Sequence, residues 1–199
     1  MKNGQLEIAQ GGWVSTDEAC PNYEDMILNM QMGHSFLKKE FGIRPRIGWM
    51  IDAFGHSQSN AALFADFGFD AIFMSRQPNE SRMKRAKDVE QSFIWKPMQK
   101  HFGDAKEIYA HFFWNHYTAP DDTLKNDISR CDDDALQDDI NLQEYNAKRK
   151  AVSMINHVQS MTKMYPAKQN IAVLVGDDFA FLDAFDNFQT IDKFIDLAN

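Results

Sequence analysis

Cysteine is nearly absent from this sequence of 199 residues, which contains only Cys20 and Cys131. Two cysteines are too few for a disulfide scaffold and their separation fits no metal-binding motif, so we expect two free thiols. Positive charge is also scarce, since 21 Lys and Arg face 29 Asp and Glu, for a formal net charge of −8. Such a chain is poorly suited to binding nucleic acid or anionic membranes, because both need positive surface.

Long apolar runs are missing as well. No run approaches the roughly 20 residues of a membrane span, and residues 1–7 contain no apolar core of a signal peptide. The sequence instead has 44% hydrophobic and 25% charged residues, with 16 Phe, five Tyr and four Trp. This composition is typical of a globular protein with a substantial core. The length predicts one domain, or most of one.

Helix and strand patterns alternate in the first part of the chain. A helix is predicted over residues 22–40, followed by a buried strand at 47–51. Ser57 is a plausible N-cap for a second helix that ends near Gly68, and a second buried strand follows at 69–75. This order is the signature of parallel βαβ units and predicts an α/β fold.

The remaining segments are less regular. Residues 77–89 read as a polar loop, and the acidic stretch 118–139 as a solvated loop. Within that stretch, Asp132-Asp133-Asp134 lacks the glycine and terminal Glu of an EF-hand. Further elements predicted from the apolar pattern are strands at 92–95, 108–113 and 171–175, a helix at 140–163 with Tyr145, Val152, Ile155, Val158 and Met161 on one face, and a final helix capped by Thr190.

Polar side chains follow several of these strands directly. Asp52 follows the strand at 47–51, Asp177 and Asp178 follow that at 171–175, and Arg76 and Tyr117 follow two others. Parallel neighbouring strands would gather these groups at one rim, where catalytic residues of α/β proteins lie. A pair of carboxylates in a cleft suits glycoside hydrolysis, in which one acid attacks or stabilises the anomeric carbon and the other protonates the leaving oxygen.

Structural roles compete with each of these interpretations. An Asp after a strand often caps a helix or forms an Asx-turn. His34 is interpreted as a packing residue, and His56 as a weak metal signal because no further ligands accompany it. The tryptophans are interpreted as core residues rather than sugar platforms; they are Trp13, Trp49 and Trp95.

Several ordered motifs resemble one known family. The motifs are Gly11-Gly12-Trp13-Val14 with Asp17-Glu18-Ala19, Gly33-His34, Phe41-Gly42-Ile43-Arg44-Pro45-Arg46, Trp49-Met50-Ile51-Asp52-Ala53-Phe54-Gly55-His56-Ser57, Leu63-Phe64-Ala65, Gly68-Phe69-Asp70 and Gly176-Asp177-Asp178-Phe179. Together they resemble glycoside hydrolase family 38, the α-mannosidases of lysosome and Golgi, with the lysosomal type most similar. The match is dense over about residues 9–76 and returns at Gly176.

This resemblance implies a parallel β/α-barrel-like catalytic domain and a zinc-dependent, retaining enzyme that removes terminal α-D-mannose from glycoprotein-derived oligosaccharides. Asp52 matches the nucleophile, which also binds Zn²⁺, and Asp178 matches the general acid/base. Residues matching the sugar subsite are Phe54, Arg76, Tyr117 and Asp177. The family further implies a lysosomal or other secretory-pathway lumen.

The sequence also departs from the family pattern. Ala53 replaces a proline and Ala180 replaces a basic residue. The family's other zinc ligands, a His-x-Asp pair upstream and a histidine well downstream, have no counterpart in the sequence, and one carboxylate cannot hold a catalytic zinc. We therefore expect residues 1–199 to be a single partial domain from inside a longer enzyme, inactive when isolated from the rest of its own chain.

Two other interpretations remain open at this point. One is a degenerate carbohydrate-binding protein that kept the fold and lost the metal. The other is a different enzyme of the wider barrel superfamily, such as a polysaccharide deacetylase. Separately, Asn79-Glu80-Ser81 fits a glycosylation acceptor, which matters only in a secreted chain.

Overall fold

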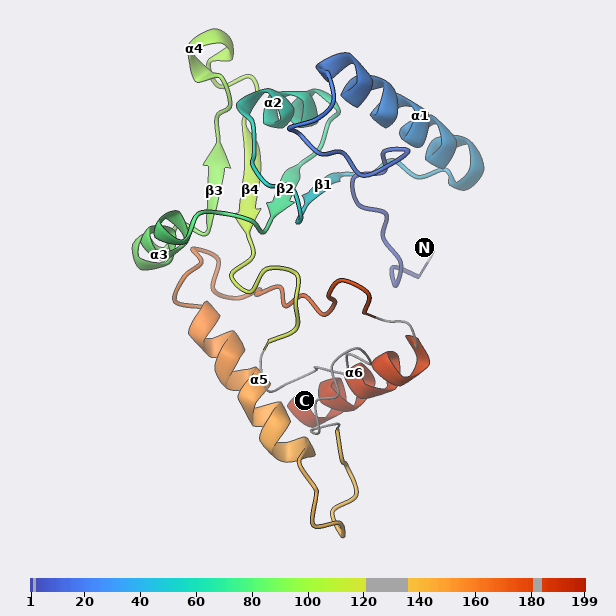
Figure 1. Cartoon of the computed structure of the whole chain (residues 1–199), viewed down its shortest axis with the longest axis vertical. Coiled ribbons are helices and arrows are strands. Elements are labelled where there is room, and N and C mark those ends of the chain that lie inside the picture. Colours follow the sequence, from blue (N-terminus) through green and yellow to red (C-terminus); the bar gives the residue numbers. More distant parts are fainter. Residues whose placement is uncertain (2, 121–135, 181–183) are drawn as a thin grey trace. The chain divides into compact units, whose positions relative to one another are not determined.

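The computed structural model describes residues 1, 3–120, 136–180 and 184–199. Two compact units divide the chain, one formed by residues 1–113 and the other by residues 114–199. Figure 1 shows the sheet in the first unit and the helices α5 and α6 in the second. Cys20 is a free, exposed thiol, as predicted, whereas Cys131 and Asp132-Asp133-Asp134 lie outside the described residues. None of the described helices is long and apolar enough to cross a membrane.

The first unit is built on a four-stranded sheet with strand order β1-β2-β4-β3 (Figure 1). The strands are β1 (Ile47–Met50), β2 (Ala71–Met74), β3 (Ser92–Trp95) and β4 (Ile108–Phe112). The first two strands and β4 are parallel, and β3 pairs antiparallel with β4. The predicted α/β class is confirmed as a mixed α/β fold, and the described residues contain no closed barrel.

Helices α1 (Tyr23–Phe41) and α2 (Gln58–Asp66) begin and end close to the predicted positions. Gly42 ends α1 in the left-handed conformation, with φ of 69°, where glycine has no Cβ to clash. The Ser57 hydroxyl accepts a hydrogen bond from the Asn60 N–H at 3.0 Å, so this residue is the N-cap of α2, as predicted.

Helix α3 (Asn79–Asp88) replaces the predicted polar loop over residues 77–89, and the short α4 (Gln99–Phe102) follows β3. None of the residues of α3 is buried, so the helix has no apolar stripe that sequence periodicity could detect. Local contacts support it instead. Lys84 forms an i,i+4 ion pair with Asp88, and the Arg85 guanidinium carbon lies 4.4 Å from the centre of the Phe93 ring.

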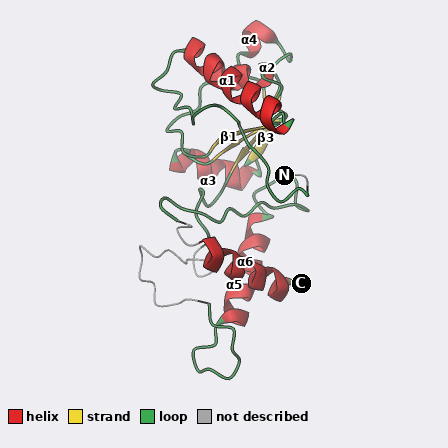
Figure 2. Ribbon diagram, turned by 90° about the vertical axis from the view of Figure 1, so that its right-hand side faces the viewer, coloured by secondary structure: helices red, strands yellow, loops and turns green. Residues whose placement is uncertain are grey.

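The core of the first unit lies where α1 and α2 pack beside the sheet (Figure 1; Figure 2). Met30 from α1 and Phe64 from α2 are almost fully buried, together with Ile72 and Met74 of β2. Gly48 leaves room for the Phe64 ring, because a Cβ there would approach a ring carbon to 2.6 Å. Of the tryptophans predicted as core, Trp95 packs against this cluster and Trp49 is half-buried, but Trp13 is 58% exposed.

The loop before α1 crosses that helix at a point where both backbones touch. Gly33 faces the backbone of Gly11 and Gly12, and the His34 Nε2 donates to the Gln10 carbonyl oxygen at 2.8 Å. His34 is therefore a packing residue, as interpreted from the sequence. The Gln10 side chain also accepts a hydrogen bond from the Trp49 N–H at 3.1 Å. These contacts attach the N-terminal loop to both α1 and β1.

The opposite face of the sheet carries the buried His111, whose Nδ1 lies 2.8 Å from the Ser92 hydroxyl. Burial lowers the pKa of His111 from its usual 6.5 to about 4, because it disfavours the charged imidazolium. Between these two values the unfolded chain binds a proton that the folded chain does not. The contribution of His111 to the free energy of unfolding should therefore be constant above pH 6.5 and fall as the pH drops towards 4.

We expect His111 to destabilise the fold by about 2–3 kcal/mol at pH 4.5 relative to pH 7. Urea unfolding of the chain and of His111→Gln at both pH values measures this effect, since glutamine does not titrate. Exposed carboxylates contribute equally to both proteins, so the difference between their pH responses belongs to His111. Equal losses of stability on acidification would contradict the prediction.

The second unit contains α5 (Ala147–Met161) and α6 (Ala184–Ala198), which pack against each other. Helix α5 is shorter than predicted. The predicted face is confirmed only in part. Met161 is buried and Tyr145 and Val158 are half-buried, but Val152 and Ile155 are exposed. The other buried residues of the helix are Ala147, Lys150 and Ala151. Thr190 lies inside α6 rather than capping it.

Residues 171–175, predicted to be a buried strand, form no strand and are only half-buried or exposed. A strand requires a neighbour to bond its backbone, and none of the described residues pairs with this segment. An apolar run alone therefore did not suffice.

Candidate active site

Asp52 and Arg76 form the centre of the candidate site in the first unit. The Arg76 Nε donates to the Asp52 Oδ1 at 2.7 Å, and its Nη2 donates to the same oxygen. The guanidinium carbon of Arg76 also lies 4.4 Å from the centre of the Phe54 ring. A guanidinium bonded to a carboxylate and stacked on an aromatic ring is held in a defined orientation.

The sheet register explains why Asp52 and Arg76 meet. Met50 and Met74 are partners in the parallel β1–β2 pair and are the last residues of their strands. Asp52 and Arg76 each follow two residues later, so both emerge at the carboxyl end of the sheet. The predicted placement of these two side chains at one rim is confirmed.

A cavity of about 750 Å³ adjoins this pair. Its lining includes Phe54, His56, Arg76, Arg85, Trp95 and Phe112, but not Asp52. Phe54 is 76% exposed, as a residue that contacts a ligand rather than the core would be. The cavity is thus aromatic with two guanidinium groups, a surface suited to the apolar faces and hydroxyls of sugars.

Asp178 and Tyr117 are brought together within the second unit. The Tyr117 hydroxyl donates to the Asp178 Oδ1 at 3.0 Å, and the Asp178 N–H donates to the Asp177 Oδ1 at 2.8 Å. Residues on both sides of this contact have left-handed backbones, with φ of 60° at His116 and 59° at Phe179. Non-glycine residues adopt this conformation at an energetic cost, and such strain is concentrated at functional sites.

The predicted site residues therefore form two groups, each inside one unit. The first comprises Asp52, Phe54 and Arg76, and the second comprises Tyr117, Asp177 and Asp178. The prediction that Asp52 and Asp178 act on one sugar remains a prediction. Asp177 accepts a hydrogen bond through its side chain from the backbone N–H of Asp178, the predicted acid.

The structure adds two residues to this site: Glu18, to which the sequence assigned no role, and His56, which was weighed only as a weak metal signal. Glu18 accepts a hydrogen bond from the Ser57 N–H at 2.5 Å, and the His56 Nε2 donates to the Arg76 carbonyl oxygen at 2.9 Å. Both residues stood in the motifs of the family resemblance. Nothing in the sequence, however, indicated that a glutamate on a polar loop would reach the turn after β1.

The described residues do not fit a zinc site. No three His, Cys, Asp or Glu side chains in the described ranges gather closely enough to hold a metal. Asp52 is the one predicted ligand, and its Oδ1 accepts two hydrogen bonds from Arg76. Its neighbour His56 points away to a backbone carbonyl and to Glu18. A catalytic zinc needs three protein ligands, so one carboxylate is insufficient.

Comparison with known proteins identifies the family. Residues 1–199 match the model of the glycosyl hydrolases family 38 N-terminal domain. The chain is 38% identical to an alpha-mannosidase of Arabidopsis thaliana over 203 residues, covering 100% of the chain and 19% of the relative. It is 34% and 32% identical to the lysosomal alpha-mannosidases of Cavia porcellus and Homo sapiens, over 100% of the chain and 20% of each relative. The chain thus spans about a fifth of the length of these relatives.

Among solved structures, an alpha-mannosidase from Enterococcus faecalis V583 matches with a TM-score of 0.45 and 19% identity, over 58% of this chain and 12% of that one. A score this low establishes neither fold nor function. The sequence match is decisive, because it includes the whole chain, and the resemblance seen in the ordered motifs is confirmed. The chain belongs to glycosyl hydrolase family 38, as part or all of its N-terminal domain.

Proposed function

We propose that this chain belongs to an enzyme that hydrolyses terminal α-D-mannose residues of glycoprotein-derived oligosaccharides. Named relatives that are alpha-mannosidases support this proposal. The structural observation that carries it is the Asp52 carboxylate at the end of β1, oriented by Arg76 beside the exposed ring of Phe54. An oriented carboxylate next to an aromatic cavity is the arrangement expected for a glycosidase nucleophile.

The proposed mechanism retains the anomeric configuration. Asp52 attacks the anomeric carbon while the glycosidic bond breaks, and Asp178 donates its proton to the departing oxygen. Water then attacks the glycosyl–Asp52 ester, Asp178 takes up the proton from that water, and Asp52 leaves as a carboxylate. Retaining enzymes separate the two carboxyl groups by about 5–5.5 Å, which leaves no room for a water molecule between the nucleophile and the sugar.

The other predicted residues orient these two acids and the sugar. Arg76 fixes the direction of the Asp52 carboxylate, and Phe54 offers a ring face beside it. Tyr117 directs one oxygen of Asp178 through its hydroxyl, and Asp177 fixes the backbone N–H of the same residue. Positioned groups of this kind lower the barrier by holding reacting atoms in line.

Three finer parts of the proposal rest on the family resemblance. They are a β/α-barrel containing the observed sheet, a zinc ion with Asp52 among its ligands and the others outside these 199 residues, and a lysosomal or other secretory-pathway lumen. Lysosomal alpha-mannosidases among the relatives support the last part. No step of the mechanism above depends on the zinc.

The function is tested with the natural protein that carries these residues. We expect it to hydrolyse an aryl α-mannoside and to release α-mannose first, as followed by proton NMR before the anomers equilibrate. Release of β-mannose would exclude the retaining mechanism. Binding of mannosides without turnover would instead favour a carbohydrate-binding protein. Dialysis against a chelator, followed by addition of Zn²⁺, tests metal dependence separately.

Removing the Tyr117 hydroxyl should weaken catalysis. Tyr117→Phe deletes the hydrogen bond to Asp178 and keeps the ring, so we expect kcat to fall about 10- to 100-fold because the acid loses its orientation. The substrate provides a control. An aryl mannoside with a very good leaving group needs little acid assistance, so its cleavage step should be less affected. Equal losses for good and poor leaving groups would contradict the assignment of Asp178 as acid.

A further inference from the structure

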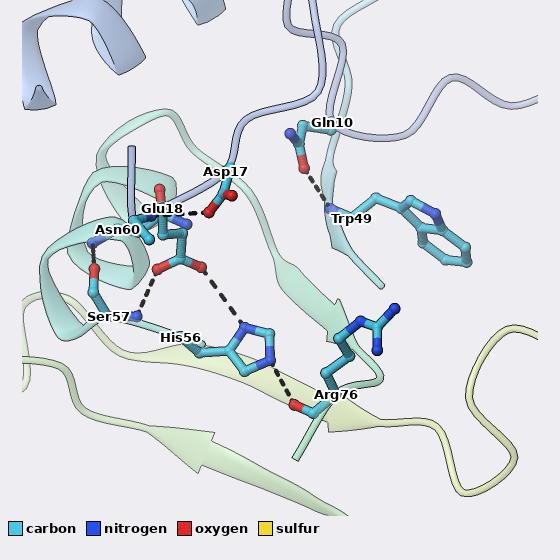
Figure 3. A network of polar contacts seen from close by, with 9 residues as sticks. Gln10, Asp17, Glu18, Trp49, His56, Ser57, Asn60 and Arg76 are labelled. Carbon is cyan, nitrogen blue, oxygen red and sulfur yellow. Dashed lines mark hydrogen bonds and ion pairs between the residues drawn. The ribbon is translucent and has the colours of Figure 1, made fainter. Parts of the chain in front are cut away.

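Glu18 is an unusual residue for the loop on which it lies. Its side chain is only 7% exposed, although a buried carboxylate loses its hydration at a cost of several kcal/mol. Glu18 Oε2 accepts a hydrogen bond from the Ser57 N–H at 2.5 Å, and Oε1 lies 3.7 Å from the His56 Nδ1. Both contacts reach the turn that joins Asp52 to α2 (Figure 3).

His56 continues this network towards the candidate site. Its side chain is 11% exposed, and its ring packs edge-on against Phe112 with 5.6 Å between ring centres. The His56 Nε2 lies 2.9 Å from the Arg76 carbonyl oxygen. A carbonyl oxygen only accepts hydrogen bonds, so Nε2 carries the hydrogen and the ring spans the gap between Glu18 and Arg76 (Figure 3).

Arg76 lies between this network and the candidate nucleophile. Its backbone is held by His56, and its guanidinium donates to the Asp52 Oδ1 at 2.7 Å. The turn that carries His56 is the same turn that begins with Asp52. A shift of His56 would therefore move Arg76 relative to the carboxylate that it orients.

We propose that Glu18 and His56 are positioning residues that set the geometry of the Arg76–Asp52 pair. This inference rests on the proposed function for its effect on catalysis, but its structural part does not. The role of Glu18 and His56 is to fix the end of β2 against the turn after β1.

A purely structural role is the alternative. In a capping box, a glutamate three residues into a helix accepts from the N-cap N–H, and Glu18 makes that contact to Ser57 from 39 residues earlier in the chain. If capping α2 were its whole purpose, any equal loss of the cap would have the same effect. Ser57→Ala provides that control, because it removes the hydroxyl bonded to the Asn60 N–H and leaves His56 unchanged.

Two His56 variants separate the hydrogen bond from the packing. His56→Phe keeps a ring against Phe112 and removes the donor to Arg76, whereas His56→Gln keeps an N–H donor on a side chain of similar reach. Glu18→Gln keeps an acceptor for the Ser57 N–H and removes the charge beside His56. All are made in the natural protein that carries these residues.

We expect His56→Phe to lower kcat on an aryl α-mannoside about 10- to 100-fold, with a smaller change in KM, and His56→Gln to recover most of that loss. Ser57→Ala should lower thermal stability without this loss of kcat. Crystal structures supply the second readout, in which His56→Phe should break the 2.7 Å contact between Arg76 Nε and Asp52 Oδ1. Glu18→Gln should displace the His56 ring.

An unchanged Arg76–Asp52 contact in His56→Phe would overturn the proposal, whatever the activity. So would equal losses of kcat in His56→Phe, His56→Gln and Ser57→Ala, since only folding would then be affected. If the unsubstituted protein cleaves no mannoside, the proposed function fails and the crystal structures alone decide the positioning role. If His56→Phe does not fold, the structure of Glu18→Gln decides instead, and an undisplaced His56 ring in it would overturn the proposal.

Discussion

Replacing Gly33 with alanine should prevent the first unit from folding. A Cβ at this position would meet the Gly11 carbonyl oxygen far inside contact distance, and would lie 2.5 Å from the Gly12 carbonyl carbon and 2.7 Å from the Trp13 nitrogen. All three are backbone atoms, so no side-chain rotation relieves the clash. We expect a loss of about 3 kcal/mol or more, at or above the upper end of overpacking effects.

The sign of this effect is informative, because intrinsic propensity predicts the reverse. Alanine is favoured over glycine inside a helix by about 1 kcal/mol, and Gly33 lies in the middle of α1. Gly55→Ala is the matched control, since a Cβ there meets nothing within 4 Å. Urea unfolding should show a normal transition for Gly55→Ala and a lost or strongly shifted one for Gly33→Ala. Unchanged or increased stability of Gly33→Ala would show that the loop does not cross α1 as described.

The elements around Asp52 could be predicted because their signals are local. Ser57 and Gly42 mark a helix start and a helix end through their own backbone chemistry, and the apolar run 47–51 lies between polar boundaries. With β1 and β2 parallel, equal spacing beyond each strand placed Asp52 and Arg76 together. Each of these rules depends on residues close together in the sequence, and they were enough to predict that part of the site.

The segments whose structure was wrongly predicted depend on partners elsewhere in the chain. Residues 171–175 are apolar enough for a strand but bond to none of the described strands. Helix α3 lacks an apolar face, so its contacts with Phe93 and Phe112 through Arg85 were not predictable from periodicity. In α5 the small residues Ala147 and Ala151 are buried, whereas Val152 is not, because close packing can favour small side chains over large ones.

The role of Glu18 was beyond sequence reasoning for a related reason. On a polar loop a glutamate is expected to be solvated, and its burial results from the approach of His56 and Ser57, 38 and 39 residues later. Gly11, Gly12 and Gly33 are a comparable case. They belong to the motifs of the family resemblance, but the sequence did not explain why glycine is needed there. The structure explains it, because the loop backbone crosses the backbone of α1 at Gly33.

Replacing Asp52 with asparagine should abolish mannoside hydrolysis in the natural enzyme while the fold survives. An amide cannot form the glycosyl ester, so we expect kcat to fall by about 10⁴-fold or more. The change in stability should be small, because the Asp52 side chain is 55% exposed and exposed ion pairs contribute about 0–1 kcal/mol. Steady-state kinetics and thermal unfolding of the same preparation measure both quantities.

The chain contains a well-matched control for this substitution. Asp70 precedes β2 and pairs with Arg46, which precedes β1, with 2.5 Å between the Asp70 Oδ2 and the Arg46 Nε. In both pairs the two residues are 24 positions apart and flank β1 and β2. Asp70 lies at the amino end of these strands, whereas Asp52 lies at their carboxyl end. Asp70→Asn should therefore alter stability about as much as Asp52→Asn and leave turnover unchanged.

A third variant tests the chemical role of Asp52 rather than its charge. Asp52→Gly opens space where the nucleophile stood, and azide can enter it and attack the same face of the anomeric carbon. A retaining α-mannosidase with Asp52 as nucleophile should then release β-mannosyl azide, because a single displacement inverts the centre. Retained hydrolysis in Asp52→Asn, or the α-azide as product, would show that another group attacks the sugar.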